Sequence, residues 1–501
     1  MNQIWNGYES HPVFHYFTKI SAIPRASGNE EGMVSFLLEF AAQKGLFAVR
    51  DEARNVFIKK PGSKGREDEA PLLLQCHTDM VAEKKAGVSH DFKKEGIVLK
   101  REDDRLFADG TTLGADDGIG VAMILSVLAD SELSHPPLEC LFTAGEEVGM
   151  DGALAFDYSQ IAARRMLNLD SSEENAVIIG CCGGVRSDLS LPYMPQSCRE
   201  EALLLTIDGL AGGHSGEDID KGRQNALSLM GKLLREIGEK TAFTLAYLTG
   251  GDKDNAIPRE CKAAILSEEE ETVRTVARIF ENEVREKLTK EDSGFTLSVQ
   301  KVPVSAHFTA ADTEKVLSVL SVRNGVFAYR TEPPRLPRTS RNLARVRTEA
   351  NEVNFGFSSR SELPAELEDS KTELDALADR IGAQNRHYAA YPGWVSSADS
   401  PMIRAYCRAY HEATGRETAP TVIHAGLECG LISERLPGLV ALSAGPDVCD
   451  LHTPAETLSL SSAVANSLPW NFKFKLELSY KTCPQKRLAF WGHDFVSRKD
   501  I

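Results

Sequence analysis

Four short apolar runs of the chain each lead into side chains that can bind a metal or exchange a proton. The runs are residues 71–76, 138–144, 166–169 and 439–443. The polar side chains that follow them are His77, Glu146 and Glu147, Asp170 and, after a Gly-Pro loop, His452. Runs this short predict buried strands. Because ligands collect beyond the carboxyl ends of parallel strands, we expect these side chains to share one site.

Helical patterns lie between the apolar runs, for example at residues 32–44 and 119–128. Strands that alternate with helices predict an α/β domain with a mainly parallel central sheet and helices on both faces. With 501 residues the chain is too long for one hydrophobic core, so we expect more than one domain.

The middle of the chain has a different pattern, which predicts a second, α+β domain inserted into the first. Its expected strands and helices are residues 202–207, 225–240, 241–249 and 268–290. The expected domain boundaries are 1–185 and 385–470 for the two parts of the α/β domain, 186–384 for the insertion and 471–501 for a tail of irregular composition. The Pro- and Arg-rich residues 329–341 are expected to form an exposed loop, and the sequence shows no internal repeat.

The charge and cysteine content bound the partners of the chain and its compartment. With 57 basic and 73 acidic residues the net charge is −16, and no basic stripe with interleaved aromatic residues is present, so we expect no nucleic-acid partner. No apolar run reaches the roughly 18 residues that a membrane helix needs, and the first residues lack the pattern of a secretion signal. The ten cysteines show no paired spacing, which favours reduced thiols and a cytoplasmic protein.

Five residues could hold two adjacent divalent cations. They are His77, Asp116, Glu147, Asp170 and His452, two imidazoles and three carboxylates. Mixed nitrogen and oxygen ligands without thiolates suit zinc, with cobalt or manganese as alternatives. Asp79 lies two residues after His77 on an extended segment, so it projects to the same face and can accept a hydrogen bond from the imidazole. Glu146 and Glu147 are consecutive and point in different directions, so one can bind metal while the other acts as a base.

Two other enzyme classes are not supported by the sequence. The segment 441–445, Ala-Leu-Ser-Ala-Gly, lacks the first glycine of the GxSxG nucleophile elbow of serine hydrolases. Neither a Walker A loop nor GxGxxG, the signatures of nucleotide-binding enzymes, is present.

Long motifs in order along the chain carry a family resemblance. They are residues 20–31, 77–81, 110–120, 146–152, 212–216, 255–259, 391–394 and 423–430. Over about residues 1–465 the chain resembles the two-zinc peptidases of the aminoacylase and carboxypeptidase-like superfamily, specifically the Xaa-His (aminoacyl-histidine) dipeptidase branch. The resemblance implies a catalytic α/β domain, an inserted lid domain and a homodimer formed through the lid.

The resemblance also implies roles for single residues. It places His77 and Asp170 on one zinc ion and Glu147 and His452 on the other, with Asp116 bridging the two. Asp79 would orient His77, Glu146 would be the general base, and His214 of the lid would hold the carbonyl oxygen of the substrate. Four further residues are expected near the lid site or in the substrate pocket: Asn255, Arg259, His424 and Glu428.

The implied activity is hydrolysis of Xaa-His and other dipeptides by a zinc-activated water. A tripeptide aminopeptidase, or a carboxypeptidase or N-acyl amino acid deacylase, with the same two-metal site is the alternative. The sequence departs from the family pattern at Asp117, where relatives often carry Asn. It departs again after about Ser462, where the family's closing helix is not recognisable.

Overall fold

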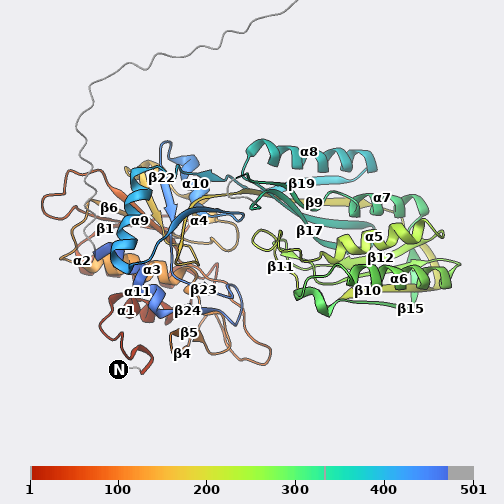
Figure 1. Cartoon of the computed structure of the whole chain (residues 1–501), viewed down its shortest axis with the longest axis horizontal. Coiled ribbons are helices and arrows are strands. Elements are labelled where there is room, and N and C mark those ends of the chain that lie inside the picture. Colours follow the sequence, from red (N-terminus) through yellow and green to blue (C-terminus); the bar gives the residue numbers. More distant parts are fainter. Residues whose placement is uncertain (1–2, 332–334, 472–501) are drawn as a thin grey trace, which may run out of the picture.

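The structure is a computed structural model that describes residues 3–331 and 335–471. The tail expected beyond Asn471 therefore lies outside the described residues. The chain forms two lobes along its long axis (Figure 1). One lobe contains both ends of the described chain and corresponds to the expected catalytic domain, and the other is built from its middle and corresponds to the expected lid domain; these names are kept below. Among the described helices, none has the length and apolar character needed to cross a membrane.

The catalytic domain is organised around a nine-stranded mixed sheet. In spatial order its strands are β1 (Phe47–Arg50), β2 (Val56–Lys60), β6 (Leu138–Thr143), β3 (Leu72–His77), β7 (Arg165–Asn168), β22 (Val440–Ser443), β8 (Ala176–Cys181) and β20 (Trp394–Val395), with β21 (Ala419–Ile423) also paired to β8. The four central strands β6, β3, β7 and β22 are parallel, as the sequence predicts. The pairs β1–β2, β2–β6, β22–β8 and β8–β20 are antiparallel, so the sheet is parallel where the site lies.

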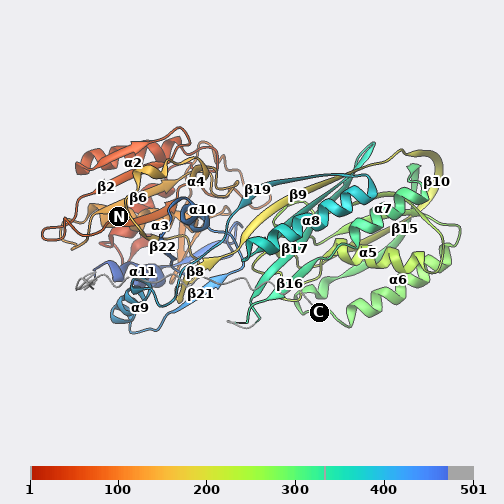
Figure 2. The same cartoon turned by 90° about the horizontal axis from the view of Figure 1, so that it is seen from above.

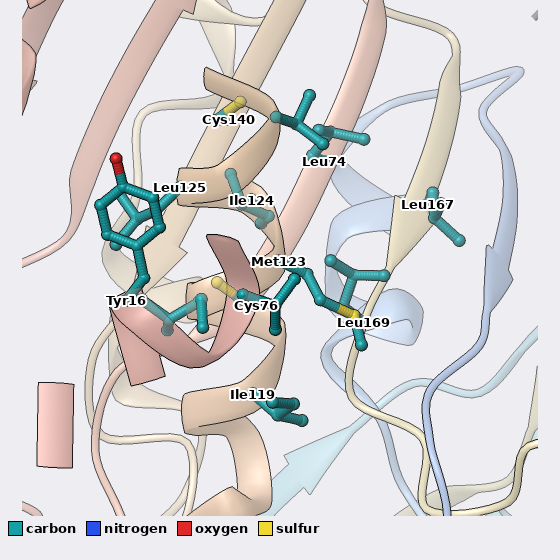
Figure 3. Packing of buried hydrophobic residues seen from close by; sticks show 14 of the residues in the cluster. Tyr16, Leu74, Cys76, Ile119, Met123, Ile124, Leu125, Cys140, Leu167 and Leu169 are labelled. Carbon is teal, nitrogen blue, oxygen red and sulfur yellow. The ribbon is translucent and has the colours of Figure 1, made fainter. Parts of the chain in front are cut away.

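Helices cover both faces of this sheet, as predicted. They are α1 (Pro12–Ser21), α2 (Glu31–Lys44), α3 (Ala115–Ala129), α4 (Asp151–Ala155), α9 (Pro401–Thr414), α10 (Glu428–Arg435) and α11 (Leu460–Asn471). Alternate residues of β3 enter different cores: Leu74 packs against α3, and Leu73 lies in the cluster that contains α10. Figure 3 shows Ile119, Met123 and Leu125 of α3 among the side chains of the first core. Helix α3 is buried on nearly all sides.

Two features near the end of the described chain bear on the site. A small sheet of β4 (Leu99–Glu102), β5 (Arg105–Ala108), β24 (Thr457–Ser459) and β23 (Val448–Cys449) carries the loop that contains His452. Helix α11 then packs against α9 and α3. The expectation that no closing helix follows Ser462 is therefore wrong as far as Asn471, because the small residues of this segment, such as Ala463, fit closely into the core.

The lid domain is a second nine-stranded sheet whose strands pair antiparallel. They are β9 (Gly183–Pro192), β10 (Gln196–Asp208), β12 (Thr244–Gly250), β14 (Cys261–Leu266), β15 (Thr296–His307), β16 (Gly325–Tyr329), β17 (Pro337–Thr348), β18 (Glu352–Ser361) and β19 (Gln384–Tyr391). Four helices lie on one face of it (Figure 2): α5 (Ala226–Gly238), α6 (Glu270–Arg285), α7 (Ala310–Leu320) and α8 (Pro364–Ile381). The sheet spans residues 183–391, so the expected boundaries at 186 and 384 fall inside it.

The lid consists of two nested units of the same topology, which the sequence did not reveal. One unit runs β10–α5–β12–β14–α6–β15, and the other runs β9–α7–β17–β18–α8–β19 with the first inserted after β9. In both, the strands lie in the order fourth, first, third, second, and the units join through β12 and β17. A repeat of topology needs only matching apolar patterns, so it can exist without recognisable repetition of residues.

The exposed loop expected at residues 329–341 is only partly found. Strand β17 already begins at Pro337, and Arg341 is fully buried. Its guanidinium donates hydrogen bonds to Ser370 and pairs with Glu373 at 2.9 Å. Charged composition predicted a surface position, but α8 supplies partners that allow the cation to be buried.

Candidate metal centre

The five candidate ligands converge at the carboxyl end of the central strands. His77 ends β3, Glu147 and Asp170 follow β6 and β7, and Asp116 lies in the first turn of α3. His452 reaches them from the loop between β23 and β24. Ligand atoms of His77, Asp116 and Asp170 lie within 4.8 Å of one another, and so do those of Asp116, Glu147 and His452. A third group of this kind contains His77, Glu146 and Glu147. The two groups that share Asp116 contain all five candidate ligands.

Each oxygen of Asp116 faces a different imidazole. Oδ1 lies 3.0 Å from Nε2 of His77, and Oδ2 lies 3.1 Å from Nε2 of His452. Asp170 completes the first group with an oxygen 3.7 Å from the His77 ring, and Glu147 completes the second at 3.1 Å from the His452 ring. A carboxylate that faces two ligand groups in this way is what a pair of adjacent cations requires of a bridging ligand.

The electrostatics of the centre indicate that positive charge belongs in it. Burial and the neighbouring carboxylates raise the pKa of Glu146 and Asp170. Burial opposes the shift at His452, but hydrogen bonds with Asp116 and Glu147 raise its pKa to about 11. One oxygen of Glu147, Oε1, is buried without a hydrogen-bond partner. A cluster of carboxylates and imidazoles packed this closely favours added positive charge, which divalent cations would supply, so the residues fit a two-metal site.

Asp79 lies behind the ligands and holds the Glu146–Glu147 segment. Its Oδ1 accepts a hydrogen bond from the amide of Glu146 at 3.0 Å, and its Oδ2 accepts one from the Ser27 hydroxyl at 2.7 Å. The predicted partner, Nδ1 of His77, is 3.5 Å from Oδ1, a longer contact than the other two. Asp79 thus orients the backbone of the candidate base as well as facing the imidazole.

Two residues that were not predicted as site residues fix the loop that carries Asp116. The buried carboxylate of Glu456 accepts hydrogen bonds from the amides of Leu113, Gly114 and Ala115, at 2.8, 2.9 and 2.8 Å. The buried guanidinium of Arg25 donates to the carbonyls of Thr78 and Asp79, at 3.1 and 2.9 Å, and also to the carbonyl of Gly114. Arg25 lies in one of the long motifs, which is the only sequence feature that marks it as a site residue. No sequence feature marks Glu456, because an isolated Glu four residues after His452 has no distinctive pattern.

Asp117, the departure from the family pattern, is buried at the start of α3. Its Oδ1 accepts a hydrogen bond from the amide of Gly120 at 3.1 Å, and its peptide bond to Asp116 is cis. Burial and the charge of Asp116 raise its pKa, in spite of the opposing charge of His77.

A cavity of about 590 Å³ opens from the metal cluster toward the lid. The lid histidine, His214, lines it together with Asp116, Glu146 and His452 of the same chain. Burial and the charge of Arg360 lower the pKa of His214 to about 3, so its ring is neutral. Nδ1 accepts a hydrogen bond from the amide of Glu217 at 3.2 Å, which leaves the proton on Nε2. His214 can thus offer a hydrogen bond to a ligand in the cavity.

The four residues expected near the substrate are placed differently from one another. Asn255 lines the cavity, and its carbonyl accepts a hydrogen bond from the Ser215 amide at 2.8 Å. His424 is buried and also lines the cavity. Arg259 is exposed and is not part of the described lining. Glu428 is fully buried beneath the centre, with hydrogen bonds from Gln75 at 2.5 Å and Thr143 at 2.7 Å, and does not line the cavity.

Arg360 of β18 is a candidate substrate residue that the sequence reasoning missed. It lines the cavity, Nη1 donates to the hydroxyl of Tyr391 at 2.5 Å, and Nη2 lies 3.5 Å from Nε2 of His214. Two other cations line the cavity, Arg186 and Lys221, and each pairs with an aspartate. Arg360 has no ion pair with a carboxylate in the described part of the chain. None of the long motifs contains Arg360, so no sequence pattern marks this position as part of the site.

Comparison with known proteins adds to the geometry. The family model "Peptidase family M20/M25/M40" matches residues 73–467. The cytosol non-specific dipeptidase of Escherichia coli K12 is 33% identical over 457 residues, 90% of this chain and 94% of the relative. The crystal structure of an aminoacylhistidine dipeptidase from Vibrio alginolyticus is 32% identical, with a TM-score of 0.77 over 92% of this chain and 96% of that one. A tripeptidase structure from Staphylococcus aureus, 16% identical with a TM-score of 0.53 over 92% and 97% of the chains, shares the fold.

Proposed function

The chain belongs to peptidase family M20/M25/M40, and we propose that within it this protein is a two-metal dipeptidase that hydrolyses Xaa-His and other dipeptides. The observation that carries the proposal is Asp116, whose two oxygens face His77 and His452, next to the cavity that Glu146 lines. The activities in the names of its relatives from E. coli and V. alginolyticus support the same substrate class.

The proposed cofactor is a pair of zinc ions, with cobalt or manganese able to substitute. His77, Asp170 and Asp116 would hold one ion, and Asp116, Glu147 and His452 the other. Imidazole and carboxylate ligands without thiolates suit these metals. When bound, the pair supplies a Lewis acid for the scissile carbonyl and lowers the pKa of an attacking water.

The side chains around the cavity divide the remaining work. Glu146 accepts the proton of the attacking water and returns it to the amine that leaves, as a general base and then a general acid. Nε2 of His214 donates a hydrogen bond to the carbonyl oxygen as negative charge develops on it. The lid closes the cavity over both groups and excludes bulk water from the reaction.

The position of Arg360 determines which substrate carboxylate the cavity can bind. As a buried cation without a carboxylate partner, it fits the free carboxylate of a peptide. Because it lies 3.5 Å from the donor of His214, a carboxylate bound there belongs to the residue directly after the scissile bond. This arrangement favours dipeptidase or carboxypeptidase action, and N-acyl amino acids carry the same carboxylate. It disfavours a tripeptide aminopeptidase, whose substrate places that carboxylate one residue further away.

A substrate panel tests the proposal. Carnosine, Ala-His, Ala-Ala, Ala-Ala-Ala and N-acetyl-His are incubated with the purified protein, with and without chelator, and Glu146→Gln protein serves as a control for contaminating peptidases. We expect chelator-sensitive cleavage of the dipeptides and little of the other two compounds. Preferential cleavage of Ala-Ala-Ala would support the tripeptide aminopeptidase or a carboxypeptidase, and cleavage of N-acetyl-His alone would support the deacylase.

We also propose a cytoplasmic homodimer formed through the lid. The lid sheet face opposite its helices carries the buried alanines 202, 246 and 264, ringed by partly exposed apolar residues that include Val302 and Val304. A second copy could cover this face. The cysteines of the described chain are free, and the E. coli relative is named for the cytosol, which supports the compartment. Analytical ultracentrifugation of wild-type and Val304→Glu protein tests the dimer, since a monomeric wild type would exclude it.

A further inference from the structure

His424 joins the two domains at three points, two through its buried imidazole and one through its backbone. It stands in the catalytic domain, in the loop between β21 and α10. Nε2 lies 2.7 Å from the hydroxyl of Ser340, on lid strand β17. Nδ1 lies 3.0 Å from the thiol of Cys182, where the chain crosses from β8 of one sheet to β9 of the other. Both partners are buried.

The third contact reaches the loop that carries the lid histidine. Gly216, in the loop that carries His214, packs closely on the backbone of His424. A Cβ at position 216 would collide with the carbonyl oxygen of His424. The same Cβ would lie 3.2 Å from the His214 ring and 3.2 Å from Nε of Arg360. His424 therefore supports the lid next to the two residues that face the substrate.

The ring of His424 is already occupied by protein partners. Burial and the charge of Arg360 lower its pKa to about 3, so the imidazole is neutral and has one donor and one acceptor nitrogen. Ser340 and Cys182 take both. Although His424 lines the cavity, it has no free nitrogen for a substrate.

We propose that His424 is a positioning residue: by linking Ser340 and Cys182 it sets the closed placement of His214 and Arg360 over the metal centre. This inference rests on the proposed function for its effect on turnover, but its structural part does not depend on it. A buried hydrogen-bonded joint at the chain crossing restricts the angle between the domains, so small shifts there are transmitted to the far side of the cavity. Displacement of a catalytic group by about 1 Å can cost about 100-fold in rate.

Matched variants test the joint. The amide of glutamine reaches the position of Nε2, and that of asparagine the position of Nδ1. We therefore expect His424→Gln to keep the link to Ser340 and His424→Asn to lose it, with Ser340→Ala removing the same link from the lid side. His411→Gln, on the exposed side of α9, is the control.

Two readouts separate positioning from stability and from activity. In hydrogen–deuterium exchange, His424→Asn and Ser340→Ala should speed exchange in residues 209–218, with metal content and melting temperature near those of His411→Gln. The kcat of His424→Asn and Ser340→Ala should fall about 10- to 100-fold with a smaller change in KM. His424→Gln should retain most of the wild-type kcat. Unchanged exchange in residues 209–218, or an equal loss of kcat in His424→Gln and His424→Asn, would reject the positioning role of His424. If wild-type protein hydrolyses no dipeptide, the proposed function fails, and the exchange comparison still decides this inference.

Discussion

Asp116 and His452 are 336 residues apart in the chain, and Oδ2 of the one lies 3.1 Å from Nε2 of the other. The second oxygen of Asp116 faces His77 at 3.0 Å. One carboxylate thus belongs to both halves of the proposed metal centre, whereas each histidine belongs to one. This difference can be measured as metal stoichiometry.

We predict that Asp116→Ala loses both metal ions and that His452→Ala preferentially loses one. Removing the shared ligand weakens both sites, whereas His452 serves only the group that contains Glu147. Elemental analysis after gel filtration measures the bound metal, and circular dichroism checks that the variants remain folded. If Asp116→Ala retains both ions, Asp116 is not the bridge.

Glu146→Gln should keep both metal ions and lose about 10²- to 10⁴-fold in kcat, the range expected for removal of a general base. Gln preserves the shape, and the contact between the residue 146 amide and Asp79 is a backbone contact that the substitution leaves in place. Kinetics and elemental analysis on the same preparation check this. Near-normal turnover would remove Glu146 from the mechanism, and loss of metal would make it a ligand.

The ligands were predictable because their positions follow from local pattern. His77, Glu147 and Asp170 come directly after apolar runs, and parallel strands bring their carboxyl ends to one edge. His452 follows the fourth apolar run after a Gly-Pro loop. Asp116 follows none of the four runs and was reached through composition and resemblance, and its proximity to His452 depends on the small sheet that carries the His452 loop.

The remaining parts of the site depend on contacts that local pattern does not encode. Glu456 accepts hydrogen bonds from amides more than 300 residues away, and amides have no sequence signature. Arg360 is notable only because no carboxylate pairs with it, which requires knowledge of every neighbour in the cavity. Arg341 was expected on a surface loop for the same reason, since its buried partners on α8 are distant in sequence.

We expect no complementation between His214→Ala and Glu146→Gln chains. His214 lines the same cavity as Glu146 within one chain, so a mixed dimer would contain no intact site. The two variants are mixed under conditions in which subunit exchange is confirmed with tagged chains, and activity is measured on Ala-His. Activity well above that of either parent would show that His214 acts on a partner subunit.

Glu428 makes stability depend on pH in the metal-free protein. Burial raises its pKa to about 7, whereas the unfolded chain keeps a value near 4.5. Below the lower value Glu428 is protonated in both the folded and the unfolded chain, so it does not reduce the free energy of unfolding. As pH rises from 4.5 to 7 the unfolded chain releases the proton first, so the folded state loses stability, by about 3 kcal/mol in total above pH 7.

Glu428→Gln should therefore stabilise the metal-free protein at pH 8 and not at pH 4.5. Gln can accept the hydrogen bonds from Gln75 and Thr143 without carrying a charge. Melting temperatures of chelator-treated wild type and variant are compared across this range, with Glu434→Gln on the exposed side of the same helix as the control. If the difference in melting temperature between wild type and Glu428→Gln is independent of pH, Glu428 does not titrate between pH 4.5 and pH 8.

Arg360→Ala should abolish the preference for a free carboxylate. The guanidinium has no carboxylate partner in the described part of the chain, and a hydrogen-bonded ion pair with a substrate carboxylate contributes roughly 1.5–3 kcal/mol, about 10- to 100-fold in kcat/KM. The measurement compares Ala-His with Ala-His amide, whose C-terminal group is neutral, for wild-type and Arg360→Ala protein. Wild-type protein should prefer the acid by that factor, and the variant should cleave the two compounds at similar, low rates. Arg404→Ala, an exposed cation of α9, should retain the preference. Equal losses on acid and amide would instead show that Arg360 acts through the neighbouring His214, whose Nε2 lies 3.5 Å from it, and not through the substrate carboxylate.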